Sequence, residues 1–500
     1  MKNLKYIAGG LVTSLVLTLT ACDDFLDVNV NPNNPTSAPI GQVLTNATVN
    51  TGFRNGSDMH RFTSMIAQHF SGQGLDGNQP REFARYLIQP TDLSNMYNVM
   101  FAGVLADTEY IINNSDGNPH YTGIAKILKA YTVSQAVDMW GDLPYTEALK
   151  GVDNFQPVVD NDEVIYTDLL RLINEGIVEI KTAASNLSPG SNETIYREDR
   201  VKWEKFANTL KLRLYLHYSE KDPAFAKAQI DALVSSGALF LGSNADNFQM
   251  SFVDAPNAQN PIHQFEVARI DQFFPNKFLV DLMNAGMDPR RKSYFTDFPF
   301  GSGSYKGAQP IETQSFAYSR LHTHLRGQLK TPLTANAAGS ILATSLANNT
   351  AYSGAAPIRM LTFAEYNFIR AEHALRFGAG PGAALPFFQA GIRASMADAG
   401  ITIAEQDAYI LTNGILEGTA ANNLKRIIEE KYIANFGVAL EPWTDWRRTG
   451  FPAIIPVPAP LAALNFIPRS LFYPESETLA NPNLKQKAGM NVRVFWDTRP

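Results

Sequence analysis

The sequence predicts a mostly α-helical fold, a tetratricopeptide-like solenoid of helix pairs with long irregular loop excursions. Apolar residues recur with the 3.6-residue period of a helix in many separate stretches. Strand-like alternation of apolar and polar residues is scarce. Antiparallel helix pairs joined by short connections fit both observations. The tetratricopeptide consensus of about 34 residues is not visible, so the pairing is an inference and not a detected repeat.

The first residues have the pattern of an export signal. Lys2 and Lys5 form a basic start, and residues 7–21 carry no charge. Such a run is too short to cross a bilayer, which needs about 20 residues, so we expect a signal peptide over 1–21. Leu19-Thr20-Ala21-Cys22 resembles a bacterial lipobox, in which the chain is cut before an acylated cysteine. An ordinary signal with an incidental cysteine is disfavoured, since the chain has no other cysteine.

Residues 22–56 are predicted to be the lipid anchor and a linker, because they are rich in Asn, Pro and Thr. Asp23 and Asp24 follow the anchor directly, either as an export address or as part of a solvated linker. Residues 57–500 are predicted to form one globular unit. The irregular stretches 285–357 and 437–500 lack an apolar period of their own and are interpreted as excursions from it.

The apolar stripes predict the helices of this unit in order. Thr91 or Asp92 can cap the second of them, and Pro119 can occupy the first turn of the third. The predicted helical stretches are 59–70, 93–112, 119–140, 164–180, 203–218, 225–234, 278–283, 363–377, 386–396 and 424–436.

Composition and charge exclude several classes of function. The formal charge of −6 becomes −8 when Lys2 and Lys5 are removed, and no Lys/Arg block exists, which disfavours nucleic acid as a partner. A lone cysteine allows no intrachain disulfide and no thiolate metal site. Gly301–Gly307 lacks the spacing of a phosphate loop. We expect neither a cofactor nor a metal.

Two acidic stretches could carry chemistry, and each also has a structural interpretation. Asp138, Asp142 and Glu147 could act as acid/base groups, but a helix end at Gly141 followed by a tight turn explains them better. "EPWTDWRRTGFP", residues 441–452, could stack on a sugar through Trp443. The favoured alternative is a buried turn in which an acid pairs with an arginine over an indole.

The excursion at 285–357 offers further candidates. Aromatic residues crowd around the Gly301–Gly307 loop, and Phe298 and Tyr305 are the positions that we expect to contact a ligand, together with Trp443. The alternative is that these rings fold back onto the body. His322 and His324 would share one face of a strand, but no third metal ligand accompanies them.

Several stretches together resemble the SusD/RagB family of nutrient-binding outer-membrane lipoproteins, in particular its SusD-like branch. Each stretch alone is weakly specific, but their number and order cover nearly the whole mature chain. They are "CDDFLDVNVNP", "VLADTEYII", "WGDLPYTEAL", "EVIYTDLL", "WEKFANTLKLRLYLH", "MDPRRKSYF", "LTFAEYNFIRAEHALRFG", "AGIRASM", "EEKYIANFGVALEPWTDWRRTGFP", "IPRSLFYPESE" and "VFWD".

The resemblance implies a mostly helical binding domain with tetratricopeptide-like pairs. It implies that acyl chains on Cys22 anchor the protein in the outer membrane, at the cell surface. It also implies a SusC-type TonB-dependent transporter as partner, to which the protein delivers an oligosaccharide or oligopeptide without cleaving it. Ligand-contacting residues vary within the family, so only Cys22 carries over.

Two other functions remain open at this point. A surface glycosidase or peptidase would need a carboxylate pair or a nucleophile in a pocket, and the sequence shows no such set. A purely structural subunit of the transport complex would bind no ligand. Aromatic loops suit both glycans and peptides, so the ligand class also stays open.

Overall fold

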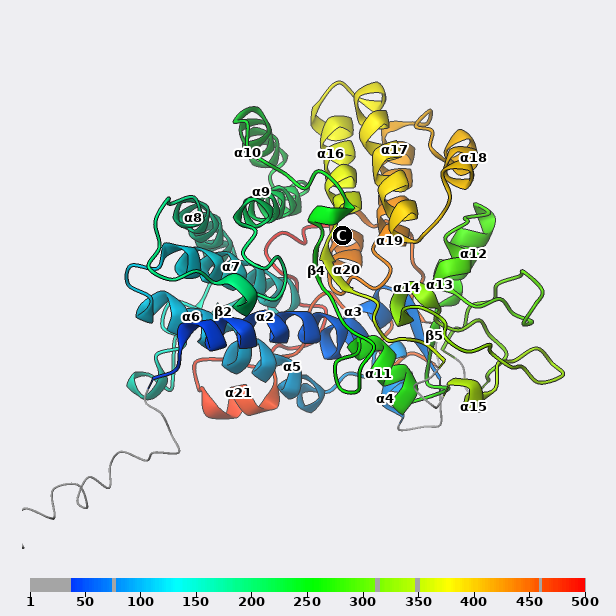
Figure 1. Ribbon diagram of the computed structural model, residues 1–500, viewed down its shortest axis with the longest axis horizontal. Coiled ribbons are helices and arrows are strands. Elements are labelled where there is room, and N and C mark those ends of the chain that lie inside the picture. The colour runs from blue at the N-terminus through cyan, green and yellow to red at the C-terminus, as the bar shows by residue number, and fades with distance from the viewer. Residues whose placement is uncertain (1–36, 74–77, 311–314, 347–350, 458–460, 500) are drawn as a thin grey trace, which may run out of the picture.

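The structure is a computed structural model that describes residues 37–73, 78–310, 315–346, 351–457 and 461–499. It confirms the predicted mostly α-helical fold, because helices make up the body and the strands are few and short (Figure 1). Cys22, the predicted signal peptide and the first part of the predicted linker lie outside the described residues.

The first group of helices forms one half of the body (Figure 1). α7 and α8 pack closely because Gly123 and Gly176 face each other, and a Cβ on either would lie 2.8 Å from the backbone oxygen of the other. Pro119 begins α7, as predicted. The helices of this group are α2 (Ile40–Gly56), α5 (Ser94–Asn98), α6 (Ala106–Asn114), α7 (Pro119–Trp140), α8 (Asp162–Ile180), α9 (Arg200–His217) and α10 (Pro223–Ser235), with a π-helical stretch at Val99–Leu105.

The second group forms the other half and contacts the first where α16 meets α9 and α10. A single apolar core runs through both groups and includes the fully buried Trp140, Trp203, Trp443 and Trp496. The helices of this group are α16 (Phe363–Phe377), α17 (Pro381–Asp398), α18 (Ile403–Asn413), α19 (Ala420–Ala434) and α20 (Glu441–Thr449).

Short elements connect and cover these groups. Three two-stranded antiparallel ladders join distant parts of the chain: β1 (Phe70–Gly72) with β5 (Phe273–Pro275), β2 (Leu143–Pro144) with β3 (Val159–Asp160), and β4 (Phe248–Met250) with β6 (Ile358–Leu361). The remaining helices are α3 (Asp58–Ile66), α4 (Gln79–Ala84), α11 (Pro261–Ala268), α12 (Lys277–Ala285), α13 (Arg291–Tyr294), α14 (Thr323–Arg326), α15 (Ala343–Leu346) and α21 (Glu475–Ala480), with 3-10 turns at Pro90–Leu93, Gly151–Asp153, Gly190–Asn192 and Asn244–Asp246.

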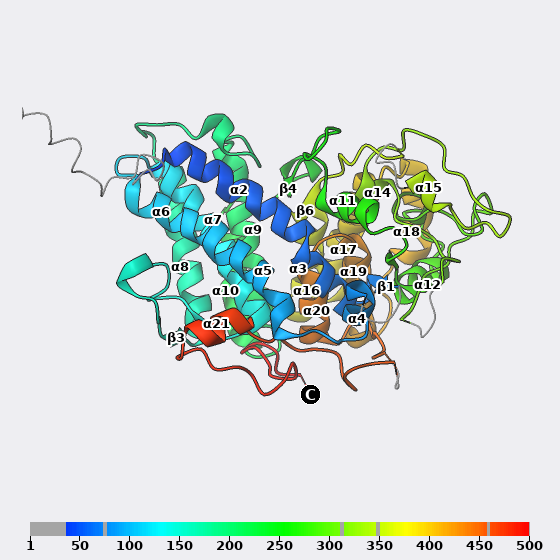
Figure 2. The same cartoon turned by 90° about the horizontal axis from the view of Figure 1, so that it is seen from below.

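The prediction that the linker extends to residue 56 is wrong, because residues 40–56 form α2. Figure 2 shows α2 running diagonally across the first group and leading into α3. Its hydroxyl and small residues form no apolar stripe, so the sequence does not predict the helix. The same residues allow α2 to pack closely on its neighbours. A Cβ on Gly52 would lie 2.5 Å from the Met250 side chain, and Gly56 lies against Ile358.

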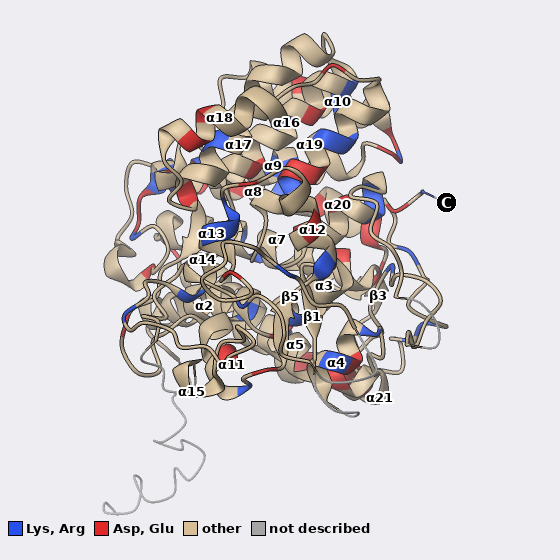
Figure 3. Cartoon of the chain, turned by 90° about the vertical axis from the view of Figure 1, so that its right-hand side faces the viewer, with Lys and Arg blue, Asp and Glu red and all other residues tan. Residues whose placement is uncertain are grey.

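The charged residues form no continuous basic face on the side shown in Figure 3, where Lys/Arg and Asp/Glu alternate along the helices. Within the ranges that the structure describes, no helix is both long and apolar enough to span a bilayer.

Candidate ligand-binding site

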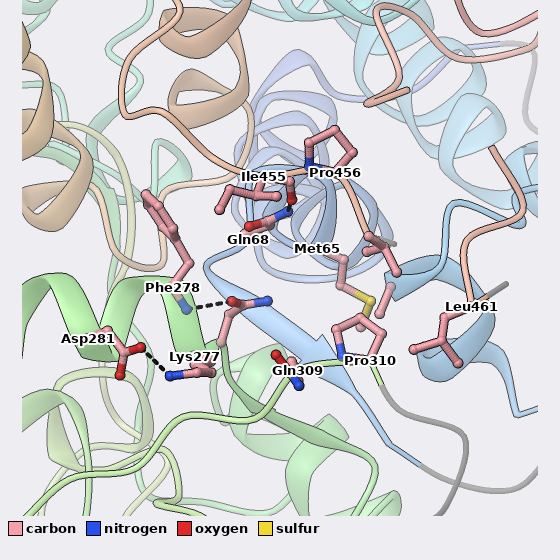
Figure 4. A pocket seen from close by; sticks show the side chains of 13 residues that line it. Met65, Gln68, Lys277, Phe278, Asp281, Gln309, Pro310, Ile455, Pro456 and Leu461 are labelled. Atoms are coloured by element: carbon pink, nitrogen blue, oxygen red, sulfur yellow. Dashed lines mark hydrogen bonds and ion pairs between the residues drawn. The ribbon is translucent and has the colours of Figure 1, made fainter. Parts of the chain in front are cut away.

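A cavity of about 360 Å³ lies between five segments of the chain (Figure 4). The segments are the end of α3, the end of α4, the start of α12, residues 309–310, and residues 455–457 with Leu461. The size falls within the range of small-ligand pockets. Met65, Gln68, Ala84, Asn276, Lys277, Phe278, Asp281, Gln309, Pro310, Ile455, Pro456, Val457 and Leu461 line it.

The lining is apolar and amide-rich, and its two charged residues neutralise each other. Eight of the thirteen residues have apolar side chains, and three are carboxamides. Lys277 and Asp281 form an ion pair one helical turn apart on α12. A pocket with this lining favours a neutral ligand that has both apolar and polar groups.

Local backbone geometry positions the carboxamides. Gln68 follows the end of α3 with φ of +58°, in the left-handed region where glycine is usual. Its backbone N–H donates to the Met65 carbonyl at 3.1 Å, and the next N–H, of His69, donates to the Ser64 carbonyl at 2.9 Å. Asn276 caps α12 by accepting from the Phe278 N–H at 2.8 Å. The end of α3 therefore fixes the backbone of Gln68, and the start of α12 fixes the side chain of Asn276.

An aromatic surface lies beside the cavity, along the same strand-like segment. Ala308 pairs with Asn276 there, which places Gln309 at the cavity, while Lys306 lies two residues before Ala308. The Lys306 ammonium lies 5.3 Å from the ring centre of Phe298 and 5.1 Å from that of Tyr318. Phe300 and Phe316, in the same excursion, are 40% and 39% exposed.

Two of the three predicted contact residues lie in this excursion. Phe298 is half-buried, with its ring covered on one side by Lys306. Tyr305 is also half-buried, and the Arg291 guanidinium lies 5.1 Å from its ring centre. Burial raises the pKa of Tyr305. Their contact with a ligand remains a prediction, and Tyr305 also packs against the core.

The prediction that Trp443 contacts a ligand is wrong, because its side chain is fully buried in this structure. Its indole N–H donates to the Pro468 carbonyl at 2.8 Å, and the Arg447 guanidinium lies 3.8 Å from its ring centre. Asp445 pairs with Arg448 at 2.9 Å. The expected pairing of an acid with an arginine is confirmed, but the arginine over the indole is Arg447 and not the paired Arg448, and the segment is helix α20 and not a turn.

The acidic residues of "VDMWGDLPYTEAL" serve the scaffold, as the structural interpretation predicted. Buried Asp138 accepts from the Trp496 indole N–H at 2.9 Å, and burial raises its pKa. Asp142 accepts from the backbone N–H of Asp162 at 2.9 Å, and Glu147 accepts from that of Val158 at 3.3 Å. These carboxylates hold the turn and the start of α8.

The two histidines do not share a strand face, since His322 precedes the short helix α14 and His324 lies within it. His322 bonds the Tyr352 hydroxyl at 2.7 Å. Burial, followed by the charge of Arg326, lowers the pKa of His322 to about 4, and burial holds the pKa of His324 well below the usual value. Across the described ranges, no three His, Cys, Asp or Glu side chains are grouped as metal ligands.

The sequence did not identify four residues of this region: Gln68, Gln309, Lys306 and Tyr318. The two glutamines carry no local signal, because the cavity forms only when segments hundreds of residues apart meet. Tyr318 and Lys306 belong to the aromatic excursion that the sequence did single out. A search for basic residues among its aromatics would have found Lys306.

The fold and this pocket define a helical protein that offers a neutral cavity and exposed rings to a ligand. The family comparison is more specific: residues 32–474 match the SusD-like family described as "Starch-binding associating with outer membrane". The chain therefore belongs to the SusD/RagB family. A comparison with curated proteins finds no match.

Solved structures agree with the fold. A chitin-binding protein superposes with a TM-score of 0.74 at 22% identity, covering 92% of this chain and 100% of its own. A chitin-binding SusD homologue from Flavobacterium johnsoniae gives 0.73 at 21% identity, covering 92% and 98%. A SusD/RagB family protein from Bacteroides thetaiotaomicron gives 0.74 at 20% identity, covering 92% and 99%. At these identities the likeness establishes the fold alone.

Proposed function

We propose that the protein is a cell-surface lipoprotein that binds oligosaccharides and delivers them to a SusC-type TonB-dependent transporter. The observation that carries the proposal is a neutral, amide-bearing cavity beside an aromatic surface, on the fold of a family described as starch-binding. The names of two structural neighbours, which are chitin-binding proteins, support a glycan over a peptide.

The chemistry of the surface suits sugar rings. The C–H faces of a pyranose stack on aromatic rings, and its hydroxyls need hydrogen-bond partners at the edge. Phe298, Phe300, Phe316 and Tyr318 supply rings, and the carboxamides of the cavity supply partners. Individually weak contacts of this kind give moderate affinity, which allows the ligand to be released to the transporter.

We infer binding without cleavage from the acids of the cavity. Glycoside hydrolysis uses two carboxyl groups that flank the scissile bond. Among the described residues that line the cavity, Asp281 is the one carboxylate, and it is paired with Lys277. A surface glycosidase is therefore the weaker proposal.

The anchor gives the protein its place of action. Acyl chains on Cys22 would hold the binding domain near the transporter, and tethering raises the effective concentration of captured ligand at the barrel mouth. A Cys22→Ser protein should fold and bind glycan but leave the membrane fraction. Membrane retention of Cys22→Ser together with normal uptake would refute the role of the anchor.

The test of the function is calorimetry of the mature chain, carrying Cys22→Ser for solubility, against panels of oligosaccharides and oligopeptides. The proposal expects saturable binding of an oligosaccharide and no change in its length on prolonged incubation. Binding of peptides alone, or release of shorter products, would overturn it. For the partner, gentle extraction of the anchored protein from its own membrane should co-purify a TonB-dependent barrel.

A further inference from the structure

One hydrogen-bond acceptor at the cavity has a fixed orientation and no partner among the residues that the structure describes. The Gln68 side-chain NH₂ donates to the Ile455 carbonyl and also lies 3.3 Å from the Tyr86 hydroxyl. A carbonyl oxygen can only accept, so the nitrogen of Gln68 must face Ile455 and the Oε1 atom must face away from it. Figure 4 shows this arrangement. In the described part of the chain, no hydrogen bond reaches Oε1.

A second carboxamide at the cavity is free. The Gln309 side chain is exposed and has no hydrogen-bond partner among the residues that the structure describes. Only its backbone carbonyl is engaged, by Gln73 Nε2 at 2.9 Å. Gln309 can therefore turn its NH₂ towards a ligand acceptor at no cost to the fold.

Most of the remaining lining of the cavity is apolar, and its third carboxamide, Asn276, already accepts from the Phe278 N–H. Met65, Phe278, Pro310 and Val457 contribute side chains without hydrogen-bonding groups. A hydroxyl buried against them would lose its hydrogen bonds to water. A methyl group buried there would instead stabilise the complex, because its transfer out of water is favourable. The acceptor of Gln68 can bind an N–H or an O–H, the amide of Gln309 can donate to a C=O, and the apolar walls favour a methyl group. An N–H, a C=O and a methyl group occur together in an acetamido group.

We propose that this cavity recognises the acetamido group of an N-acetylated sugar. The inference rests on the proposed glycan-binding function and narrows it to a class of sugar. The acetamido N–H donates to Gln68 Oε1, its carbonyl accepts from Gln309, and its methyl packs on the apolar walls. The paired charges of Lys277 and Asp281 leave no net charge to attract an acidic or basic substituent.

The discriminating experiment uses three β-1,4-linked trisaccharides that differ only at the C2 substituent. They are tri-N-acetylchitotriose, the deacetylated amine and cellotriose, titrated into the soluble mature chain by calorimetry. We expect the acetylated sugar to bind at least about tenfold more tightly than the other two, since losing an apolar contact together with a hydrogen bond to Gln68 has an effect of this size. Saturation-transfer NMR should show the acetyl methyl as the most strongly contacted group.

Two variants test the residues. Gln309→Leu removes an exposed, unpartnered amide, and Gln68→Met removes the acceptor while keeping the length of the side chain. Each should reduce the preference for the acetylated sugar to about threefold or less, because each removes one of the two hydrogen bonds to the acetamido group. Gln42→Leu, at an exposed position on α2 away from the cavity, is the matched control and should change nothing.

The outcomes separate this inference from the proposed function. Equal binding of cellotriose and the acetylated sugar, or binding only of other glycans, overturns the acetamido pocket and leaves glycan capture standing. An acetyl preference that survives both glutamine variants also overturns it. If no oligosaccharide binds at all, the proposed function is refuted together with the acetamido pocket.

Discussion

Replacing Glu372 by Gln should destabilise the protein by about 3 kcal/mol at pH 7 without weakening glycan binding. Glu372 is fully buried on α16 and pairs with Arg448 of α20 at 2.5 Å. Burial alone would raise the pKa of Glu372, but the Arg448 and Arg376 guanidiniums outweigh it and hold that pKa at about 2, below the ordinary value of 4.5. A pKa that is one unit lower in the folded than in the unfolded protein stabilises the fold by about 1.4 kcal/mol at neutral pH, which gives the expected loss.

The direction of this pKa shift determines how the stabilisation by Glu372 depends on pH. The folded-state pKa is lowered, so the stabilisation is complete above about pH 4.5 and disappears as the pH falls towards 2. Urea denaturation at pH 7 and at pH 3 should therefore show a large gap between the wild type and Glu372→Gln at pH 7 and a smaller one at pH 3. Glu417→Gln, at an exposed position, is the control. A gap below about 1 kcal/mol at pH 7, or loss of glycan affinity in the folded variant, would refute the structural role of "EPWTDWRRTGFP".

Three further predictions test other parts of the structure. Trp443→Ala should lower the free energy of unfolding by about 3–5 kcal/mol and leave the glycan affinity of the folded protein unchanged, as calorimetry and thermal denaturation would show, because the ring is buried core. Gly176→Ala should cost about 1–3 kcal/mol in urea denaturation, since its Cβ would press on the backbone oxygen of Gly123, whereas Gly382→Ala, which meets open space, should not destabilise the protein. Phe298→Ala should weaken oligosaccharide binding by about 1 kcal/mol, roughly fivefold in Kd, through the loss of one stacking ring. An unchanged Kd would show that Phe298 does not contact the ligand.

Long amphipathic helices were predictable because their periodicity is local. α7, α8, α9 and α16 appear in the structure close to their predicted bounds. α2 was missed because its buried residues include Thr48, Thr51 and Gly52, which do not form an apolar stripe in the sequence. Tertiary contacts stabilise that helix. It packs mainly on the stretch Val99–Leu105 and on α6, and its contacts with β4 and β6 join residues about 200–300 positions apart.

The candidate site was only partly predictable for the same reason. The aromatic excursion stands out by composition, so Phe298 and Tyr305 could be chosen from sequence. Trp443 was chosen on the same grounds, although its neighbours Asp445 and Arg448 belong to a buried ion-pair network that composition cannot reveal. The cavity depends on Gln68 meeting Ile455 across the whole chain, and no single segment carries that information.

The central claim is that a glycan occupies the cavity and the neighbouring aromatic surface. The most direct measurement is a crystal structure of the protein with the oligosaccharide that binds most tightly in calorimetry. We predict a sugar ring against Phe298 or Tyr318 and a substituent of the sugar within hydrogen-bond distance of Gln68 or Gln309, with an unbroken glycosidic bond. A glycan bound at another face of the molecule, with this cavity filled only by solvent, would contradict the account.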